Sequence, residues 1–246
     1  MPRPAPAADE PDGLLRRTGM TPVELGLVRR LPLLANLEPA RLADLLADAQ
    51  VREAGRGTVL FLQGDPADRF YVVLDGWVRL YRETPDGAEI TIALFTRGES
   101  FAEAAMLASG RFPVCAQVAE PARLLTVPAS SFLGALAADK RLCLNMMASM
   151  ARRLQGFVRQ IEALSRRSTV QRLAAFLVKL GEGKSSPVTL ALPLDKTLVA
   201  ARLGMQPETL SRAFAKLRRL GVETAGAEVR IADLEALRAL AENEEP

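Results

Sequence analysis

The first half of the chain passes from helical to extended hydrophobic periodicity. Residues 25–37 (LGLVRRLPLLANL) and 39–49 (PARLADLLADA) have the apolar spacing of short helices. Later segments are rich in Val, Ile, Phe, Tyr and Thr and partly alternate apolar with polar positions; they cover residues 58–65, 69–83 and 89–98. An Asp-Gly pair between the last two segments favours a hairpin turn. This pattern predicts a small antiparallel barrel or sandwich rather than a Rossmann-type sheet, which needs helices between its strands.

One long helix is predicted next, from about Asp139 to Leu164. Its apolar residues recur every seven positions in two registers, Cys143, Met150, Phe157 and Leu164 in one and Met147, Leu154 and Ile161 in the other. Such positions over about three heptads are typical of a coiled-coil seam. Packing of the helix against the chain's own barrel would give a similar period. We expect dimerisation, through an interface of Met147, Met150, Leu154, Phe157, Ile161 and Leu164.

The last third of the chain is expected to be helical until near its close. Residues 168–183 (STVQRLAAFLVKLGEG) predict one helix, with Gly181 just past its end. Residues 194–221 predict two helices joined at Gly204, and Asp195 is a suitable N-cap for the first. The final segment, VETAGAEVRIADLEAL, has the pattern of a two-stranded wing with a glycine at its tip.

The second helix of this pair is amphipathic. Pro207 occupies its first position, where the missing N–H of proline costs nothing. Leu210, Phe214 and Leu217 form an apolar stripe, and Gly221 is expected to end the helix. The pattern predicts that one face of this helix is buried and that the other is free for contacts.

The polar residues at the start of this helix suit the reading of base pairs. Glu208, Ser211 and Arg212 lie three and four positions apart, so their side chains leave from one face. Arginine can donate two hydrogen bonds to guanine, glutamate can accept from cytosine, and serine can contact either edge. The simpler possibility is an ion pair between Glu208 and Arg212, worth about 0.3 to 0.5 kcal/mol. The predicted DNA contacts are Lys196, Gln206, Glu208, Thr209, Ser211, Arg212 and Lys216.

Charge supports this interpretation. From Ser165 to Leu220 there are eleven Lys and Arg against three acids, a local balance of +8 in a chain whose net charge is +3. A basic C-terminal third on an acidic body is typical of a nucleic-acid-binding protein. A solvated basic helix surface would explain the same charge more simply. A regulatory module like the cyclic-nucleotide subunits of kinases would explain the barrel but not this basic third.

Composition narrows the classes of protein to which the chain can belong. With 49% hydrophobic and 25% charged residues, the chain resembles an ordinary globular protein, and no apolar run approaches the roughly 18 residues of a membrane span. Residues 1–20 are expected to be a disordered tail rather than a signal peptide. Two cysteines without a pattern favour a reducing compartment, the cytoplasm. Without a histidine base, a metal-ligand cluster or a Gly-rich phosphate loop, enzyme activity is not expected.

Three motifs in order resemble those of one family. "LFLQGDPADRFYVVLDGWVRLYRE" is similar to its effector-domain signature, "MARRLQ" to its dimerisation helix and "LGMQPETLSRAF" to its recognition helix. The family is the cyclic-AMP receptor and fumarate-nitrate-reduction regulator (Crp/Fnr) superfamily of bacterial transcription factors, and the resemblance covers roughly residues 31–240. It implies an α+β fold: a β-roll of the cyclic-nucleotide-binding jelly-roll type over residues 21–138, a dimerisation helix over 139–166 and a winged helix-turn-helix over 167–246.

The resemblance also implies partners. The "ETLSR" segment matches the anaerobic branch of the family, in which Glu208, Ser211 and Arg212 would contact a TTGAT-like half-site. A homodimer would then bind an inverted repeat in double-stranded DNA, with half-sites about one helical turn apart. RNA polymerase is the further partner that the family implies, and no membrane is involved.

Departures from the family's sequence pattern narrow the choice of effector. The positions aligned with its phosphate-binding Arg-Ser pair are Phe112 and Pro113, and those of its adenine contacts are Phe157 and Val158. These changes disfavour a cyclic nucleotide, although Glu103 is kept and Arg111 lies one residue away from the phosphate position. The effector pocket implied by the resemblance consists of Phe101, Glu103, Met106, Arg111, Leu154 and Phe157.

Haem is a further candidate cofactor. "ESFAEAAM" and "QPET" resemble the nitric-oxide-responsive denitrification branch, which is thought to sense nitric oxide through haem. This chain has no histidine, so a haem would need Cys115, Cys143, a methionine such as Met106, a tyrosine or the amine of Pro2. An N-terminal cysteine cluster is absent, so an iron-sulfur oxygen sensor is excluded. The haem ligands of the carbon-monoxide sensor align with Ala102 and Ala104, so that haem ligation is missing too. The same residues are compatible with an unidentified apolar effector and with a regulator that needs no ligand.

Overall fold

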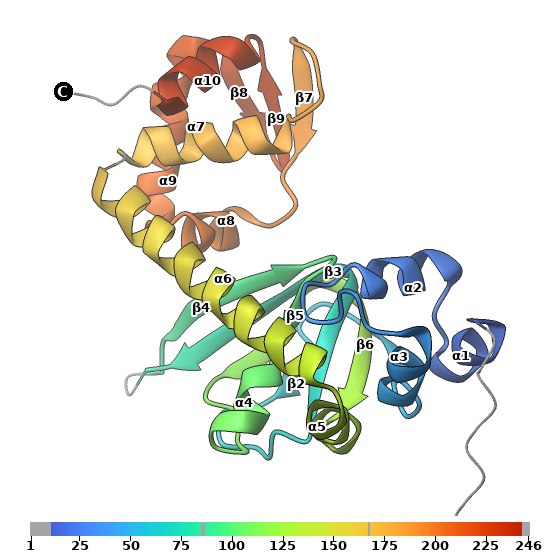
Figure 1. The fold of residues 1–246 in the computed structure, drawn as a ribbon. Helices are drawn as coiled ribbons and strands as arrows, with labels where there is room; N and C mark the ends of the chain where they lie inside the picture. Colours follow the sequence, from blue (N-terminus) through green and yellow to red (C-terminus); the bar gives the residue numbers. More distant parts are fainter. Residues whose placement is uncertain (1–10, 85–86, 167, 243–246) are drawn as a thin grey trace, which may run out of the picture. The chain divides into compact units, whose positions relative to one another are not determined.

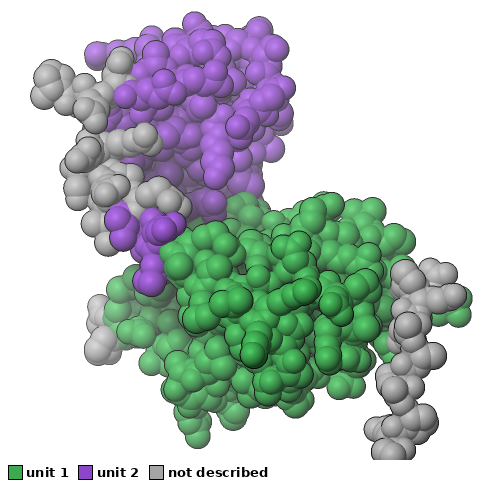
Figure 2. Space-filling model, in the orientation of Figure 1, with its two compact units in different colours: residues 1–153 green, residues 154–246 purple. Residues whose placement is uncertain are grey.

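The computed structural model describes residues 11–84, 87–166 and 168–242, and for residues 11–12 and 159–166 it describes the backbone only. The chain divides into two compact units, residues 1–153 and 154–246 (Figure 2). The division falls inside the long helix α6 (Lys140–Arg166), between Arg153 and Leu154, rather than at either end of it. Each unit has its own fold.

Short helices begin the first unit. They are α1 (Pro11–Thr18), α2 (Pro22–Arg29) and α3 (Pro39–Leu45). Both helices expected here are shorter than their apolar patterns suggested, and α2 ends before Pro32, which has no N–H to donate and disfavours helical backbone at the preceding residue. Helix α1 lies within the segment expected to be a disordered tail, and it buries Leu14 in the core. Residues 1–10 of that tail lie outside the described residues.

An antiparallel β-roll forms the body of this unit (Figure 1). Its strands are β1 (Gln50–Ala54), β2 (Val59–Phe61), β3 (Arg69–Glu83), β4 (Glu89–Thr96), β5 (Ser100–Phe101) and β6 (Cys115–Pro128). The sheet order is β1-β6-β3-β4, with β2 also on β6 and β5 also on β3. The predicted hairpin is confirmed, since Glu83 pairs with Glu89, although Pro85 and Asp86 lie outside the described residues. Helices α4 (Glu103–Ala108) and α5 (Ala129–Ala138) complete the unit.

Strand β3 is the centre of the first unit because both of its faces are buried. Phe70 packs on Phe132 of α5 with ring centroids 5.0 Å apart, while Tyr71, on the opposite face, stacks on Phe101 at 5.0 Å. The strand continues past Gly76, whose φ is +82° and whose added Cβ would lie 2.1 Å from the Pro121 carbonyl oxygen. Only glycine fits this crossing of β3 and β6.

The second unit contains the helix-turn-helix. Its elements after α6 are α7 (Thr169–Leu180), β7 (Val188–Ala191), α8 (Lys196–Arg202), α9 (Pro207–Leu217), a 3-10 turn (Arg218–Leu220), β8 (Val222–Ala225), β9 (Glu228–Ile231) and α10 (Leu234–Glu242). The predicted end of α7 before Gly181 is confirmed. The expected two-stranded wing is β8 and β9, but β7 also pairs with β9, so the sheet has three strands. Helix α9 ends four residues before Gly221, because the 3-10 turn intervenes.

Candidate nucleic-acid interface and ligand sites

Local interactions fix helix α9 on its neighbours. The Asp195 side chain caps α8 by accepting a hydrogen bond from the Leu198 N–H at 2.9 Å, as the sequence predicted. The turn that follows closes through the Met205 N–H, which donates to the Ala200 carbonyl at 3.0 Å, and Gly204 has a φ of +62°. Pro207 begins α9 at its first position. The predicted stripe is buried, which turns the opposite face of α9 to solvent; its members are Leu210, Phe214 and Leu217.

The exposed face of α9 carries the predicted base-reading residues. Glu208, Ser211 and Arg212 are all exposed. Arg212 Nη2 donates to Thr209 Oγ1 at 3.2 Å, and Ser211 Oγ donates to the Pro207 carbonyl at 3.1 Å. Among the described residues no ion pair forms between Glu208 and Arg212, which was the simpler use expected of these side chains. Both charged groups are therefore available to a partner.

The other predicted DNA contacts surround this face. Gln206 and Lys216 are exposed, and Thr209 is half-buried beneath Arg212. Lys196 is exposed at the start of α8, with Nζ 5.9 Å from the centre of the Phe214 ring. A lysine in the first turn of a helix opposes the helix dipole, so helix stability does not explain it. Lys196 thus places a positive charge beside α9.

In the first unit, the buried Glu103 and the exposed Arg153 form a polar cluster with Ser100. Glu103 is only 4% exposed, and its Oε1 accepts hydrogen bonds from Arg153 Nη2 at 3.2 Å and Ser100 Oγ at 3.3 Å. Arg153 Nη2 also donates to the Ser100 carbonyl at 2.8 Å. Glu103 Oε2 is buried without a hydrogen-bond partner among the described residues. A carboxylate oxygen in this state can accept a hydrogen bond from a ligand hydroxyl.

The sequence singled out Glu103 but missed Arg153. That arginine lies within the quoted "MARRLQ" motif, and its guanidinium lies 5.3 Å from the centre of the Phe95 ring. Ala102, just before Glu103, has a φ of +75°, which is rare for a residue other than glycine. Such an outlier costs about 1 to 3 kcal/mol and is typical of functional sites.

The remaining residues of the predicted effector pocket are divided between the two units. Phe101 and Met106 are buried in the core, while Arg111 is exposed and donates to the Gly64 carbonyl at 2.7 Å. Leu154 and Phe157 are 64% and 52% exposed and belong to the second unit. The described contacts join Glu103 to none of them, and the pocket as a whole stays a prediction.

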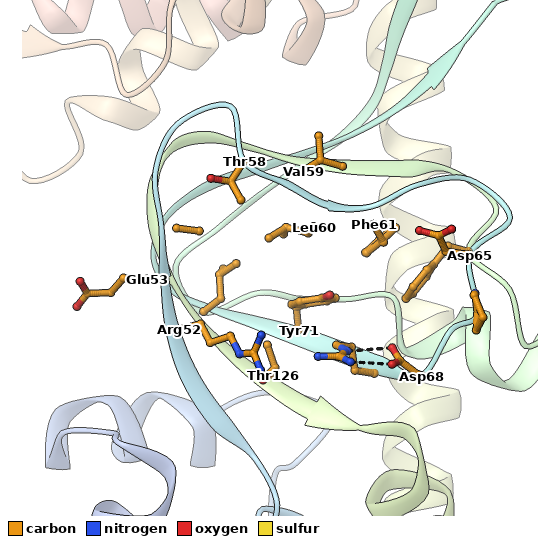
Figure 3. A pocket seen from close by; sticks show the side chains of 15 residues that line it. Arg52, Glu53, Thr58, Val59, Leu60, Phe61, Asp65, Asp68, Tyr71 and Thr126 are labelled. Atoms are coloured by element: carbon orange, nitrogen blue, oxygen red, sulfur yellow. Dashed lines mark hydrogen bonds and ion pairs between the residues drawn. The ribbon is translucent and has the colours of Figure 1, made fainter.

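A cavity that the sequence did not predict lies inside the roll (Figure 3). Its volume is about 560 Å³, and we call it the roll cavity. Its lining comes from β1, β2, β3 and β6 and the loops between them: Arg52, Glu53, Ala54, Thr58, Val59, Leu60, Phe61, Asp65, Pro66, Asp68, Arg69, Tyr71, Phe112, Leu124 and Thr126. None of the six residues expected in the effector pocket lines it. Sheet register brings these residues together, and no local motif marks them.

Four of the candidate haem ligands, Cys115, Cys143, Met106 and Tyr71, are poorly suited to hold iron in the roll cavity. Cys115 is buried and its Sγ accepts from the Gln63 N–H at 3.2 Å, while Cys143 Sγ donates to the Leu136 carbonyl at 3.1 Å. Neither cysteine lines the roll cavity, and neither does the buried Met106. Tyr71 does line it, but burial raises its pKa, which opposes the phenolate that iron would need. Pro2 lies outside the described residues.

Helix α6 carries an exposed apolar stripe. Of the predicted interface, Met147, Met150, Leu154 and Phe157 are 38% to 64% exposed. The same helix packs on the core of the first unit through Leu142 and Met146, which are 1% and 4% exposed. Packing against the chain's own roll therefore does not account for Met147 and Met150, which belong to the first unit. The side chains of Ile161 and Leu164 lie outside the described residues.

Comparison with known proteins matches both halves of the chain. Residues 51–139 match the cyclic nucleotide-binding domain, and residues 171–240 match the Crp-like helix-turn-helix domain. The chain belongs to the Crp/Fnr family. Members of this family are transcriptional regulators and not enzymes, and this Crp/Fnr protein is accordingly a DNA-binding transcriptional regulator with the predicted α+β fold. None of its described helices is long and apolar enough to cross a membrane.

Several relatives of this Crp/Fnr protein are well matched. The cyclic AMP receptor protein of Thermus thermophilus is 32% identical over 195 residues, which cover 79% of this chain and 89% of that protein. A structure of a candidate cyclic nucleotide binding protein from Ruegeria pomeroyi is 37% identical, with a TM-score of 0.70 over 90% of this chain and 98% of that one. DNR from Pseudomonas aeruginosa is 30% identical, with a TM-score of 0.53 over 90% of this chain and 99% of that one.

Proposed function

We propose that this Crp/Fnr protein acts in the cytoplasm as a homodimer that binds an inverted repeat of TTGAT-like half-sites through helix α9. The observation that carries the proposal is the exposed set Glu208, Ser211 and Arg212, free of mutual ion pairing, on a helix fixed by its buried stripe. The apolar stripe of α6 supports a second copy of the chain as partner, because it would otherwise remain in water. RNA polymerase is the further partner that the family implies.

Control through the β-roll is part of the same proposal. The unpaired oxygen of Glu103 favours an effector with a hydroxyl group, and the Thermus relative is described as a cyclic AMP receptor. Yet Phe112, at the position expected to hold the phosphate, is buried and stacks on Phe61 with ring centroids 3.7 Å apart. The first candidate effector is therefore an unidentified molecule that carries a hydroxyl group, and a cyclic nucleotide is the second. Nitric oxide sensed through haem is the third, and the absence of a suitable ligand among the described residues weighs against it.

The test is a DNA-binding titration by fluorescence anisotropy. The full chain is titrated against a duplex with the inverted TTGAT repeat, a duplex with one half-site, and a scrambled duplex of the same composition. Tight binding only to the inverted repeat, falling about 1,000-fold or more between 50 and 200 mM salt, supports a dimeric reader. Equal binding to all three duplexes would refute sequence reading, and no binding at low salt would refute the function.

A further inference from the structure

The roll cavity has the size and shape of a small-molecule site. Its volume of about 560 Å³ lies within the range of about 300 to 1,000 Å³ typical of ligand pockets. Phe61 and Phe112 stack against each other on one side of it, and Leu60 and Leu124 add apolar surface. It shares no lining residue with the Glu103 cluster. The cavity is thus distinct from the Glu103 cluster, although it includes Phe112 of the expected phosphate position, and its walls combine apolar with charged residues.

Arg52 is the one charged lining residue without a partner among the described residues. The other charges are satisfied within the protein: Arg69 donates to both carboxylate oxygens of Asp68 at 2.9 and 2.7 Å, Glu53 accepts from Arg123 at 2.9 Å, and Asp65 accepts from the Leu62 N–H at 2.9 Å. On β1, Arg52 pairs in register with the buried Leu124 of β6, so both side chains lie on the same face of the sheet. That face lines the cavity (Figure 3).

Tyr71 adds an unpaired hydroxyl. The residue is only 5% exposed and lines the cavity, yet its hydroxyl makes no hydrogen bond among the described residues. This hydroxyl oxygen is not one of the fully buried unpaired atoms of the described residues, so it is open to the cavity and available to a bound molecule. Figure 3 shows Tyr71 on the central strand, between Arg52 and the wall formed by Phe61. A free cation and a free hydroxyl therefore lie beside an aromatic wall.

We propose that the roll cavity binds a small monocarboxylate with an aromatic body. Its carboxylate pairs with Arg52, its ring packs on Phe61 and Phe112, and the Tyr71 hydroxyl supplies a further hydrogen bond. The charges of the lining residues favour a monocarboxylate over a dianion and over a neutral molecule. A dianion such as a phosphate monoester would place its second charge near Asp65 and Asp68 with no further free cation among the described lining residues, and a neutral ligand would gain no ion pair from the exposed Arg52. The proposal concerns binding alone and is independent of DNA recognition.

The test is isothermal titration calorimetry of the full chain without DNA. The probes are phenylacetate and 3-phenylpropionate, each with its neutral amide, and phenethylamine as the cationic counterpart. We expect one site per chain for the acids and at least about 10-fold weaker binding of the amides, because a charge-assisted hydrogen bond is lost. No saturable binding of either acid would overturn the proposal, as would equal binding of acid and amide or a preference for the amine.

Single-residue variants test whether the acids bind in the roll cavity. Arg52→Gln should weaken acid binding about 10-fold or more, and its exposed position leaves the fold intact, which circular dichroism checks. Arg97→Gln is the matched control, since Arg97 is exposed and lies outside the cavity lining. Tyr71→Phe keeps the ring stacked on Phe101 and should weaken binding several-fold. Acid binding that is unchanged in Arg52→Gln would place the ligand elsewhere and refute the assignment.

Discussion

Individual side chains set the DNA sequence preference proposed for this protein, and Arg212 is the clearest case. It projects from the exposed face of α9 and is held only by one hydrogen bond of 3.2 Å to Thr209 among the described residues, a neutral partner that DNA can replace at little cost. The sequence predicted this residue because helical spacing and the buried stripe define the face on which it lies. Arg153 was missed, because its role depends on Ser100 and Glu103, which lie about 50 residues earlier in the chain.

Arg212→Ala tests base reading. We expect a loss of about 1 to 3 kcal/mol on the inverted repeat, together with relaxed preference at one base pair, because a bidentate contact to guanine disappears. Affinities for the repeat and for each single-base variant of it, measured at one salt concentration, check this. Arg97→Ala is the control and should bind every duplex as the wild type does. An equal loss on all duplexes would instead assign Arg212 to a phosphate.

Arg123 is a second decisive residue, this time for stability. It donates to Glu24 at 2.6 Å, to Glu53 at 2.9 Å and to the Gly19 carbonyl at 2.8 Å, so it joins β6 to β1 and to the start of α2. Burial alone would raise the pKa of Glu24, but the hydrogen bonds from Arg123 and from Thr21 outweigh it and hold the pKa below the ordinary value of 4.5. The carboxylate form is thus stabilised by folding.

This lowered pKa gives a pH dependence with a definite sign. A carboxyl whose folded pKa is depressed contributes stability above about pH 4.5, and that contribution is lost as the pH falls through the folded pKa. Arg123→Met should therefore lower the free energy of unfolding by about 1.5 to 3 kcal/mol at pH 7 and by progressively less as the pH falls through the folded pKa of Glu24. Urea unfolding at pH 7 and at a series of lower pH values measures it. Arg56→Met, whose ion pair with Glu120 is more exposed, should cost no more than about 1 kcal/mol.

At the scale of elements, local signals were reliable where one segment determines its own structure. Three local signals can be recognised in the sequence: the cap at Asp195, the turn at Gly204 and the proline at position 207. Helices α8 and α9 form as these signals predict. Strand β7 was missed because four residues are too short for a clear hydrophobic period, and it is held as a strand by pairing with β9. Helix α10 was read as part of the wing, although Leu234, Leu237 and Ala241 have helical spacing and are buried.

The stripe on α6 yields a prediction about assembly. Leu154→Glu and Phe157→Glu each place a charge where a partner helix would pack, so each should raise the dimer dissociation constant at least about 10-fold. Sedimentation equilibrium over a range of protein concentrations measures this. Gln155→Glu, at an exposed polar position one residue away, should leave assembly unchanged. A wild-type chain that is monomeric at every concentration would contradict the proposed homodimer.

At the scale of the whole molecule, the chain has two separate hydrophobic cores. The core of the first unit extends from Leu14 to Met146 in sequence, and the second unit buries its own set, which includes Leu173, Leu217 and Ile231. Composition and motif order predicted a roll, a dimerisation helix and a helix-turn-helix, and the division between the units inside α6 was not expected. The roll cavity could not be predicted in the same way, because its lining spans residues 52–126 and depends on how β1, β3 and β6 are registered.

Two cores should unfold separately. Differential scanning calorimetry is expected to show two transitions, because each unit loses its own buried surface. An arylcarboxylate at about 100 times its dissociation constant should stabilise only the first unit, by about 2.7 kcal/mol, and raise only one of the two midpoints. A single transition with equal calorimetric and van't Hoff enthalpies would contradict independent cores. A shift of both midpoints would mean that the ligand contacts both units.

The crossing at Gly76 has a consequence for how related chains can diverge. A side chain at this position would collide with the backbone of Pro121 and Ala122, and its φ is unfavourable for every other residue. The two nearest atoms belong to the backbone, which every residue carries, so a substitution at position 121 or 122 would not make room for a side chain at position 76. Within an alignment of relatives, Gly76 should therefore be retained wherever β3 and β6 cross in this way, even where the effector and the operator have both been exchanged.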